Sequence, residues 1–123
     1  MTLPCRKASV RSSAAQWNVD ALVRAGSGDL LPCFFSVLPT GCTFQTVSSE
    51  EGEKLLDSVR TALGPTASVP QVVKGGACGG EDEDGEFPFV GAMLSVTWDF
   101  PREARDSFVV KVKELLGACE ASA

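Results

Sequence analysis

The segment Phe87–Cys119 constrains the fold most strongly, because a strand pattern passes directly into a helix pattern there. Apolar side chains occupy alternate positions of Phe87–Phe100, which is the period of a strand with one buried face. Pro101 then suits the first turn of a helix, where its fixed φ is favourable and its missing N–H would have no partner. From Phe108 to Cys119, apolar residues recur at intervals of three and four and so form one side of a helix. We expect this strand and this helix to pack into the core, although they carry no chemistry of their own.

A second helix is predicted between Ser48 and Leu63. Ser48 and Glu51 have the spacing of a capping box, in which each side chain satisfies a backbone N–H of the first turn. Gly64-Pro65 ends the helix, because glycine can adopt a left-handed conformation and proline cannot continue the helix. Its apolar side consists of Leu55, Leu56, Val59, Ala62 and Leu63.

Other segments have the pattern of strands, and they are Gln16–Arg24, Leu30–Leu38, Cys42–Val47 and Val69–Lys74. Gln16–Arg24 also fits a helix that would end at Gly26, but its alternating β-branched and aromatic residues favour a strand. The turn Pro39–Gly41 joins two of these strands into a hairpin. Pro70 places the last of them near an edge of the sheet, because proline has no N–H to donate.

These segments predict a single α+β domain over residues 16–120, with the order β-β-β-α-β-β-α. The sheet would have about five strands, mostly antiparallel, and the two helices would cover one of its faces. Residues 75–86 form a predicted mobile loop, because their glycines and acidic residues bury too little apolar surface to offset the entropy cost of ordering. A chain of 123 residues is long enough for one core without a metal or a disulfide.

Residues 1–15 are basic and rich in serine and alanine, with no acidic residue. This composition fits either a flexible tail or a targeting segment of the mitochondrial or plastid type. We expect a flexible tail, because Leu3 and Val10 are its only sizeable apolar residues and leave no convincing amphipathic face. In an organellar protein, the same residues would be a targeting signal or would contact ribosomal RNA.

The charge and the cysteines limit the function and the compartment. A formal charge of −5 argues against a nucleic-acid-binding protein, whose surface would be basic. Five cysteines, an odd number, without a secretory signal favour reduced thiols in an intracellular compartment, either cytoplasmic or, with a targeting N-terminus, mitochondrial. The uncharged run Leu30–Ser49 is not predicted to enter a membrane, because its prolines and glycine would leave backbone groups without partners in lipid.

Histidine and tyrosine are absent from the chain, which excludes nucleophile–histidine pairs and imidazole metal ligands. The cysteine spacings match no zinc or redox motif, and the acidic run Glu81–Glu86 lacks the end carboxylates of an EF-hand loop. Gly75–Gly80 matches no phosphate-binding loop. We therefore expect no catalytic residue, no metal and no cofactor. An enzyme that uses Asp99, Lys74 or the acidic run as reactive groups is a less favoured alternative.

Large apolar residues on both sides of two predicted strands are the main functional signal. Phe87, Phe89 and Met93 lie opposite the buried positions of their strand. Phe34 and Phe35 are adjacent, so their side chains point to opposite faces. Either another layer of the fold or a partner chain then covers the second face of the sheet. We predict that these five residues include the contacts with a partner.

The element order over Cys42–Cys119 resembles that of the small heterodimeric proteasome assembly chaperones. The resemblance rests on a short strand with a capped helix, a strand near Val69–Lys74, a polar insertion, a long strand ending in VTWDF and the helix FVVKVKELLGAC. It implies a subunit of a heterodimer and assigns no site residue.

The sequence therefore predicts a non-enzymatic protein-interaction module, a small subunit or assembly factor of a larger complex. Its partners would be other protein chains, in a homo- or hetero-oligomer, and neither a specific nucleic acid nor the interior of a membrane. A subunit similar to the proteasome assembly chaperones and a subunit of an organellar complex are the alternatives.

Overall fold

The computed structural model describes residues 5–13, 15–24, 28, 30–74, 92–117 and 121–122. The strands are β1 (Cys5–Ser12), β2 (Trp17–Arg24), β3 (Leu30–Leu38), β4 (Gly41–Val47), β5 (Gln71–Lys74), β6 (Ala92–Asp99) and β7 (Ala121–Ser122). The helices are α1 (Glu50–Leu63) and α2 (Arg105–Leu116), and a 3₁₀ turn, η1 (Arg102–Ala104), directly precedes α2.

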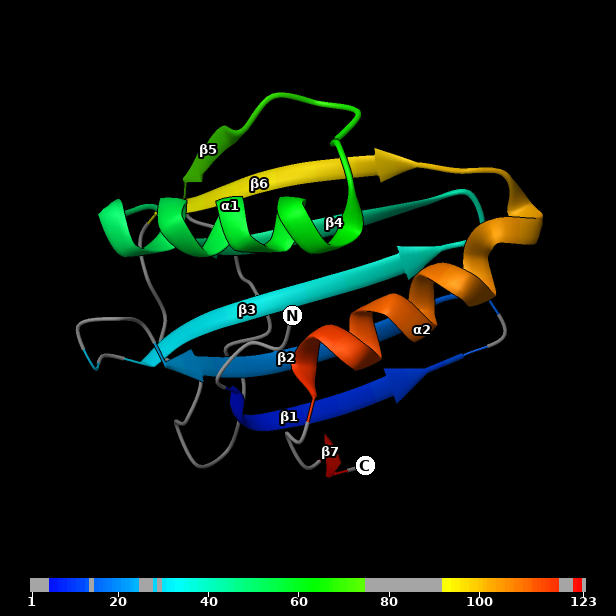
Figure 1. Ribbon diagram of the computed structural model, residues 1–123, viewed down its shortest axis with the longest axis horizontal. Coiled ribbons are helices and arrows are strands. Elements are labelled where there is room, and N and C mark those ends of the chain that lie inside the picture. Colours follow the sequence, from blue (N-terminus) through cyan, green and yellow to red (C-terminus); the bar gives the residue numbers. More distant parts are fainter. Residues whose placement is uncertain are drawn as a thin grey trace.

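The strands form one sheet with the order β5-β6-β4-β3-β2-β1-β7. All neighbours are antiparallel except β1 and β7, which are parallel. Both helices lie on the same face of the sheet, with α1 against β4 and α2 against β3 (Figure 1). The predicted α+β class and the predicted element order are confirmed, and β1 and β7 extend the sheet beyond the predicted strands.

The segment β2–β3–β4 is a meander, because these consecutive strands pair with one another antiparallel. Trp17–Arg24 pairs along its whole length with β3, which excludes the helical alternative for this segment. The two residues Pro39 and Thr40 join β3 to β4. Cys33 lies opposite Thr46 and not opposite Cys42, and both thiols are free, so no disulfide crosses this hairpin.

The start of α1 differs from its prediction by one residue. The hydroxyl of Ser49, and not that of Ser48, accepts a hydrogen bond from the N–H of Gly52 at 3.1 Å, so the predicted capping box does not form. The N–H of Ser48 donates instead to the carbonyl of Ala92 on β6, also at 3.1 Å. Gly64 ends the helix with φ of 98°, as its position after the apolar stripe predicted.

The passage from β6 to α2 also differs from its prediction. β6 begins at Ala92, and the predicted earlier part of this strand lies outside the described residues. Pro101 precedes η1 instead of opening α2, and its carbonyl accepts a hydrogen bond from the N–H of Ala104 at 2.9 Å. Proline suits this capping position for the predicted reason, because no N–H is required there. The added turn moves the first residue of α2 to Arg105.

The prediction of a flexible tail is wrong for Cys5–Ser12, which forms β1 in the sheet. β1 pairs with β2 from Ser12 opposite Trp17 to Cys5 opposite Val23, and the N–H of Ser13 donates to the carbonyl of Gln16 at 2.8 Å in the connecting turn. Backbone pairing supplies hydrogen bonds that composition does not reveal, so a segment with few apolar residues can still be a strand. A role of this segment in targeting stays a prediction.

The core lies between the sheet and the helices. Phe35 and Phe44 are fully buried at its centre, with ring centroids 4.8 Å apart. Trp98 is buried as predicted, contacts Phe108 and donates its indole N–H to the carbonyl of Gly64 at 3.0 Å, which ties the end of α1 to β6. Within the described residues no helix lies on the opposite face of the sheet, which we call the helix-free face (Figure 1).

Candidate functional site

The face of the sheet opposite the helices contains the candidate site. Side chains alternate between the two faces of a strand, so the neighbours of core residues point to this face. Strand register places six of them in two rows across β2, β3 and β4. We call these six residues the central patch: Asn18, Ser36 and Thr43 in one row, and Asp20, Phe34 and Gln45 in the other.

The central patch is hollowed into an open depression of about 230 Å³, which Arg11 of β1, Gln16 and Phe35 also line. Small-molecule sites usually have volumes of roughly 300–1,000 Å³ and enclose most of the ligand. A depression of this size and openness can receive a side chain from another protein better than it can enclose a whole small molecule.

An ion pair between neighbouring strands borders the depression. A guanidinium nitrogen of Arg11 lies 3.0 Å from a carboxylate oxygen of Asp20, and the Arg11 side chain is 61% exposed while that of Asp20 is 12% exposed. Burial raises the pKa of the Asp20 carboxyl above its ordinary value, and the charge and hydrogen bond of Arg11 limit that rise. Asp20 is therefore a largely desolvated carboxylate that pairs with an exposed cation, Arg11.

Three polar side chains form a closed hydrogen-bonded triangle in the same depression. The side-chain amide N–H groups of Gln16 donate to the Asn18 oxygen at 2.9 Å and to the Ser36 hydroxyl at 2.8 Å. The hydroxyl of Ser36 donates in turn to the Asn18 oxygen. Amides cannot accept the proton of a hydroxyl as a base does, so these partners of Ser36 do not activate it as a nucleophile. The triangle fixes polar groups in place and does not resemble catalytic machinery.

The predicted contact residues separate into different environments. Phe34 is half-buried in the central patch, whereas Phe35 is a core residue under the helices and cannot meet a partner directly. Met93 lies on the helix-free face but is 1% exposed. Phe87 and Phe89 lie outside the described residues. Of the five predicted residues, Phe34 is the one that the structure places in the depression.

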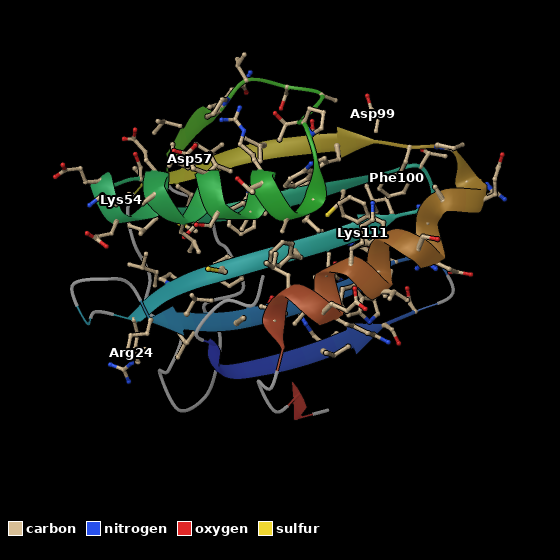
Figure 2. The ribbon with its side chains drawn as sticks, viewed as in Figure 1. Arg24, Lys54, Asp57, Asp99, Phe100 and Lys111 are labelled. Atoms are coloured by element: carbon tan, nitrogen blue, oxygen red, sulfur yellow. The ribbon has the colours of Figure 1, made fainter. Side chains whose placement is uncertain are left out.

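The reactive groups proposed for an enzyme are not brought together. Asp99 ends β6 with an exposed side chain that points away from the sheet (Figure 2). Lys74 pairs with Ala92 at the opposite end of β6, seven residues away from Asp99. That separation corresponds to about 23 Å along a strand, too far for both groups to act on one reacting bond. The acidic run lies outside the described residues.

The two described hairpin thiols are unsuited to chemistry. Burial raises the pKa of Cys33 to about 12, although a contact with Thr46 opposes the rise. Burial likewise raises the pKa of Cys42 to about 12. A thiol must ionise to act as a nucleophile or a metal ligand, so both behave as small apolar core residues. Cys78 and Cys119 lie outside the described residues.

Within the described ranges, no group of three or more cysteine, aspartate or glutamate side chains is placed to hold a metal ion. Neither helix in these ranges is long and apolar enough to cross a membrane.

The sequence held a signal for part of the site. The alternation in Gln16–Arg24 already placed Asn18 and Asp20 opposite the apolar positions, but nothing indicated which strands would flank them. Arg11 was missed because its segment was interpreted as a tail. Its position beside Asp20 follows from the pairing of β1 with β2, which the sequence did not predict.

Comparison of the chain with models of protein families, with curated proteins and with solved structures finds no match.

Proposed function

We propose that the protein is a non-enzymatic interaction module, a small subunit or assembly factor of a larger complex, which binds another protein chain through the central patch. The observation that carries this proposal is the contrast between the two faces of the sheet. Two helices bury one face, while the other holds half-buried Phe34 among fixed hydrogen-bonding groups. A partner side chain inserted into the depression would contact Phe34 and meet donors and acceptors that are already oriented.

The polar composition of the central patch favours a partner that binds reversibly. Obligate interfaces resemble a hydrophobic core cut in half, whereas interfaces that form and dissociate contain more polar surface. The central patch has one large apolar side chain, Phe34, and the polar side chains of Asn18, Asp20, Ser36, Thr43 and Gln45. This composition fits an assembly factor, which must be released, better than a permanent structural subunit.

A heterodimer subunit similar to the proteasome assembly chaperones is a more specific version of this proposal, and the element order over Cys42–Cys119 is what supports it. An organellar subunit with a cleaved N-terminus has less support. Cleavage after residue 15 would remove β1 and, with it, the Arg11 partner of Asp20.

The test is the native mass of the tagged full-length protein in extract of the source cells, measured by size exclusion with identification of co-purifying chains. We expect the wild type to elute far above its chain mass of 12.9 kDa, together with a defined partner in fixed ratio. Phe34→Asp should shift it toward the monomer position, because a carboxylate would be placed without compensation in the apolar part of the contact. Circular dichroism of each purified variant verifies folding.

Val110→Asp is the matched control, because it introduces the same charge at an exposed apolar position on α2, with 52% exposure, on the helix-covered side. This variant should retain the partner. Elution of the wild type near 12.9 kDa with no other chain would overturn the proposal. Loss of the partner in the Val110 variant alone would transfer the contact from the sheet to α2.

A further inference from the structure

The strand β5 forms one edge of the sheet and exposes apolar side chains there. It pairs with β6 and is the last strand in the sheet order, where Figure 1 shows it at the top of the view. Val69, Val72 and Val73 are 71%, 55% and 37% exposed, and they are three of the five exposed large apolar residues in the described part of the chain. A sheet edge can pair with a further strand, because its outward backbone N–H and C=O groups lack partners in the sheet.

The hydrogen bonds of β6 show which of its backbone groups point toward β5. The carbonyl of Thr97 accepts a hydrogen bond from the N–H of Ala67 at 2.7 Å, and the N–H of Thr97 donates to the hydroxyl of Ser68 at 3.1 Å. Both groups of Thr97 therefore point away from β4, toward the side on which β5 lies. Alternate residues of an antiparallel strand turn their backbone groups to the same side, so those of Ser95 and Met93 also point toward β5.

Val72 consequently presents both of its backbone hydrogen-bonding groups to the outside of the sheet. Gln71 and Val73 lie opposite Ser95 and Met93, so their backbone groups point inward to β6. The N–H and C=O of Val72, between them, point outward, as does the N–H of Lys74. Pro70 has an outward carbonyl but no N–H. Among the described residues, none bonds to the outward backbone groups of Val72.

We propose that β5 pairs with β5 of a second copy of this chain, antiparallel about a two-fold axis at Val72. The N–H of each Val72 then donates to the carbonyl of the other, and the N–H of each Lys74 donates to the carbonyl of Pro70 in the other copy. About four backbone hydrogen bonds join the copies in this register. The strand suits its own copy as occupant, because it has no acidic residue and its one charged residue, Lys74, lies opposite an uncharged proline. Pro70 ends the ladder on each side, which gives the contact a defined length.

The proposed contact also extends a row of the core. Strand register places Val72 at the end of a row on the helix-covered face, after the buried residues Ala21, Cys33, Thr46 and Leu94. The two Val72 side chains would meet on this face and bury apolar surface that a single chain leaves in water. Two strands this short bury less than the roughly 1,200–2,000 Å² of a stable complex, so we expect a weak, concentration-dependent dimer. The central patches of both copies would lie on the same side of the joined sheet.

The test is sedimentation equilibrium of the purified full chain from micromolar to millimolar concentration. The mean mass should rise with concentration from 12.9 kDa toward twice this value. Val72→Pro removes the outward N–H and no hydrogen bond of the fold, because an edge strand tolerates proline where the N–H faces solvent. This variant should weaken dimerisation about tenfold or more, because each copy loses one hydrogen bond to the other. Val72→Lys should weaken it to a similar extent, because two like charges would then lie directly opposite. Circular dichroism verifies that each variant is folded.

Val110→Lys is the matched control, because it introduces the same charge on α2 at a position with 52% exposure, close to the 55% of Val72. It should dimerise as the wild type does, and a loss equal to that of Val72→Lys would overturn the proposal. A wild type that stays at 12.9 kDa throughout the range would also overturn it. If Val72→Pro then lost a protein partner in cell extract, the edge would be assigned to a strand of a different chain. Phe34→Asp should leave dimerisation unchanged, so this proposal and the proposed interaction function can fail separately.

Discussion

The two faces of the sheet use neighbouring residues of the same strands for different purposes. Phe35 points under the helices, is 1% exposed and packs on Phe44, whereas Phe34 points to the helix-free face and sits among polar side chains. Burial of apolar surface is the main source of stability, and hydrogen bonds between polar groups contribute less because the unfolded chain forms them with water. The helix-covered face therefore holds most of the buried apolar side chains, while the other face combines buried Leu22 and Met93 with the polar side chains of the central patch.

Adjacent phenylalanines allow the strongest test of this comparison. Phe35→Ala should lower the free energy of unfolding by about 3–5 kcal/mol, because it removes a fully buried ring and leaves a cavity. Phe34→Ala should cost less than half as much, because the half-buried ring at this position is partly solvated already. Urea unfolding of the two variants measures both values. Equal losses would mean that both faces belong to the stabilising core.

A second, smaller effect should show how closely α1 packs against β4 on the helix-covered face. A Cβ added at Gly52 would lie 1.9 Å from the carbonyl oxygen of Val47. Gly52→Ala should therefore lower the free energy of unfolding by about 1–3 kcal/mol through overpacking, although alanine is normally the better helix former by about 1 kcal/mol. Glu53→Ala, at the next and exposed position of α1, should stay within about 0.5 kcal/mol of the wild type. Thermal unfolding compares the two, and a stabilised Gly52 variant would show that α1 can move away from β4.

The smallest change in stability is expected from substitution of Asp20 on the helix-free face, and this change depends on pH. Because the pKa of Asp20 is raised in the folded state, the native protein holds this proton more tightly than the unfolded chain does. Its contribution to stability is present below the ordinary pKa of 3.8 and is lost as the pH rises through the folded value. Asp20→Asn removes this dependence. The stability of the variant relative to the wild type should therefore rise as the pH is raised from 3.5 to 7.

This gain should not exceed about 1 kcal/mol, because an ion pair with an exposed partner contributes little. Urea midpoints at both pH values measure it, with Asp57→Asn on the outer side of α1 as the control (Figure 2). A loss of stability at pH 7 in the Asp20 variant would make the Arg11–Asp20 pair a stabilising contact and would weaken the contrast between the faces.

Side-chain periodicity predicted well which residues are buried on the helix-covered face, because burial of one side of a helix or strand imposes that periodicity on the sequence. Leu55, Leu56 and Val59 were assigned to the buried side of α1, and the structure buries all three. Trp98 was likewise placed in the core. Features that depend on backbone pairing were missed, because they leave little trace in composition. β1 is the clearest case, and the Ser49 cap and the 3₁₀ turn after Pro101 are smaller ones.

The candidate site was only partly predictable for the same physical reason. Alternation placed Phe34 on the face opposite Phe35, but the depression also requires Arg11 from β1 and the register that aligns β2 with β3 and β4. The turn after β1 likewise lies beside the start of α2, although the residues of the two segments are some ninety positions apart. Long-range neighbours of this kind are set by the whole topology and not by any local pattern.

The buried thiols of Cys33 and Cys42 can report how often the protein opens locally. While the sheet is closed, neither sulfur is accessible or ionised enough to react with an alkylating reagent. Alkylation therefore requires the β3–β4 hairpin to separate from the helices. Its rate reports how often that separation occurs. With Cys5, Cys78 and Cys119 replaced by serine, mass spectrometry of the two remaining sulfurs would time this opening in the free protein. The same alkylation rate, measured with a partner or ligand present, would show how far binding slows the opening of the hairpin.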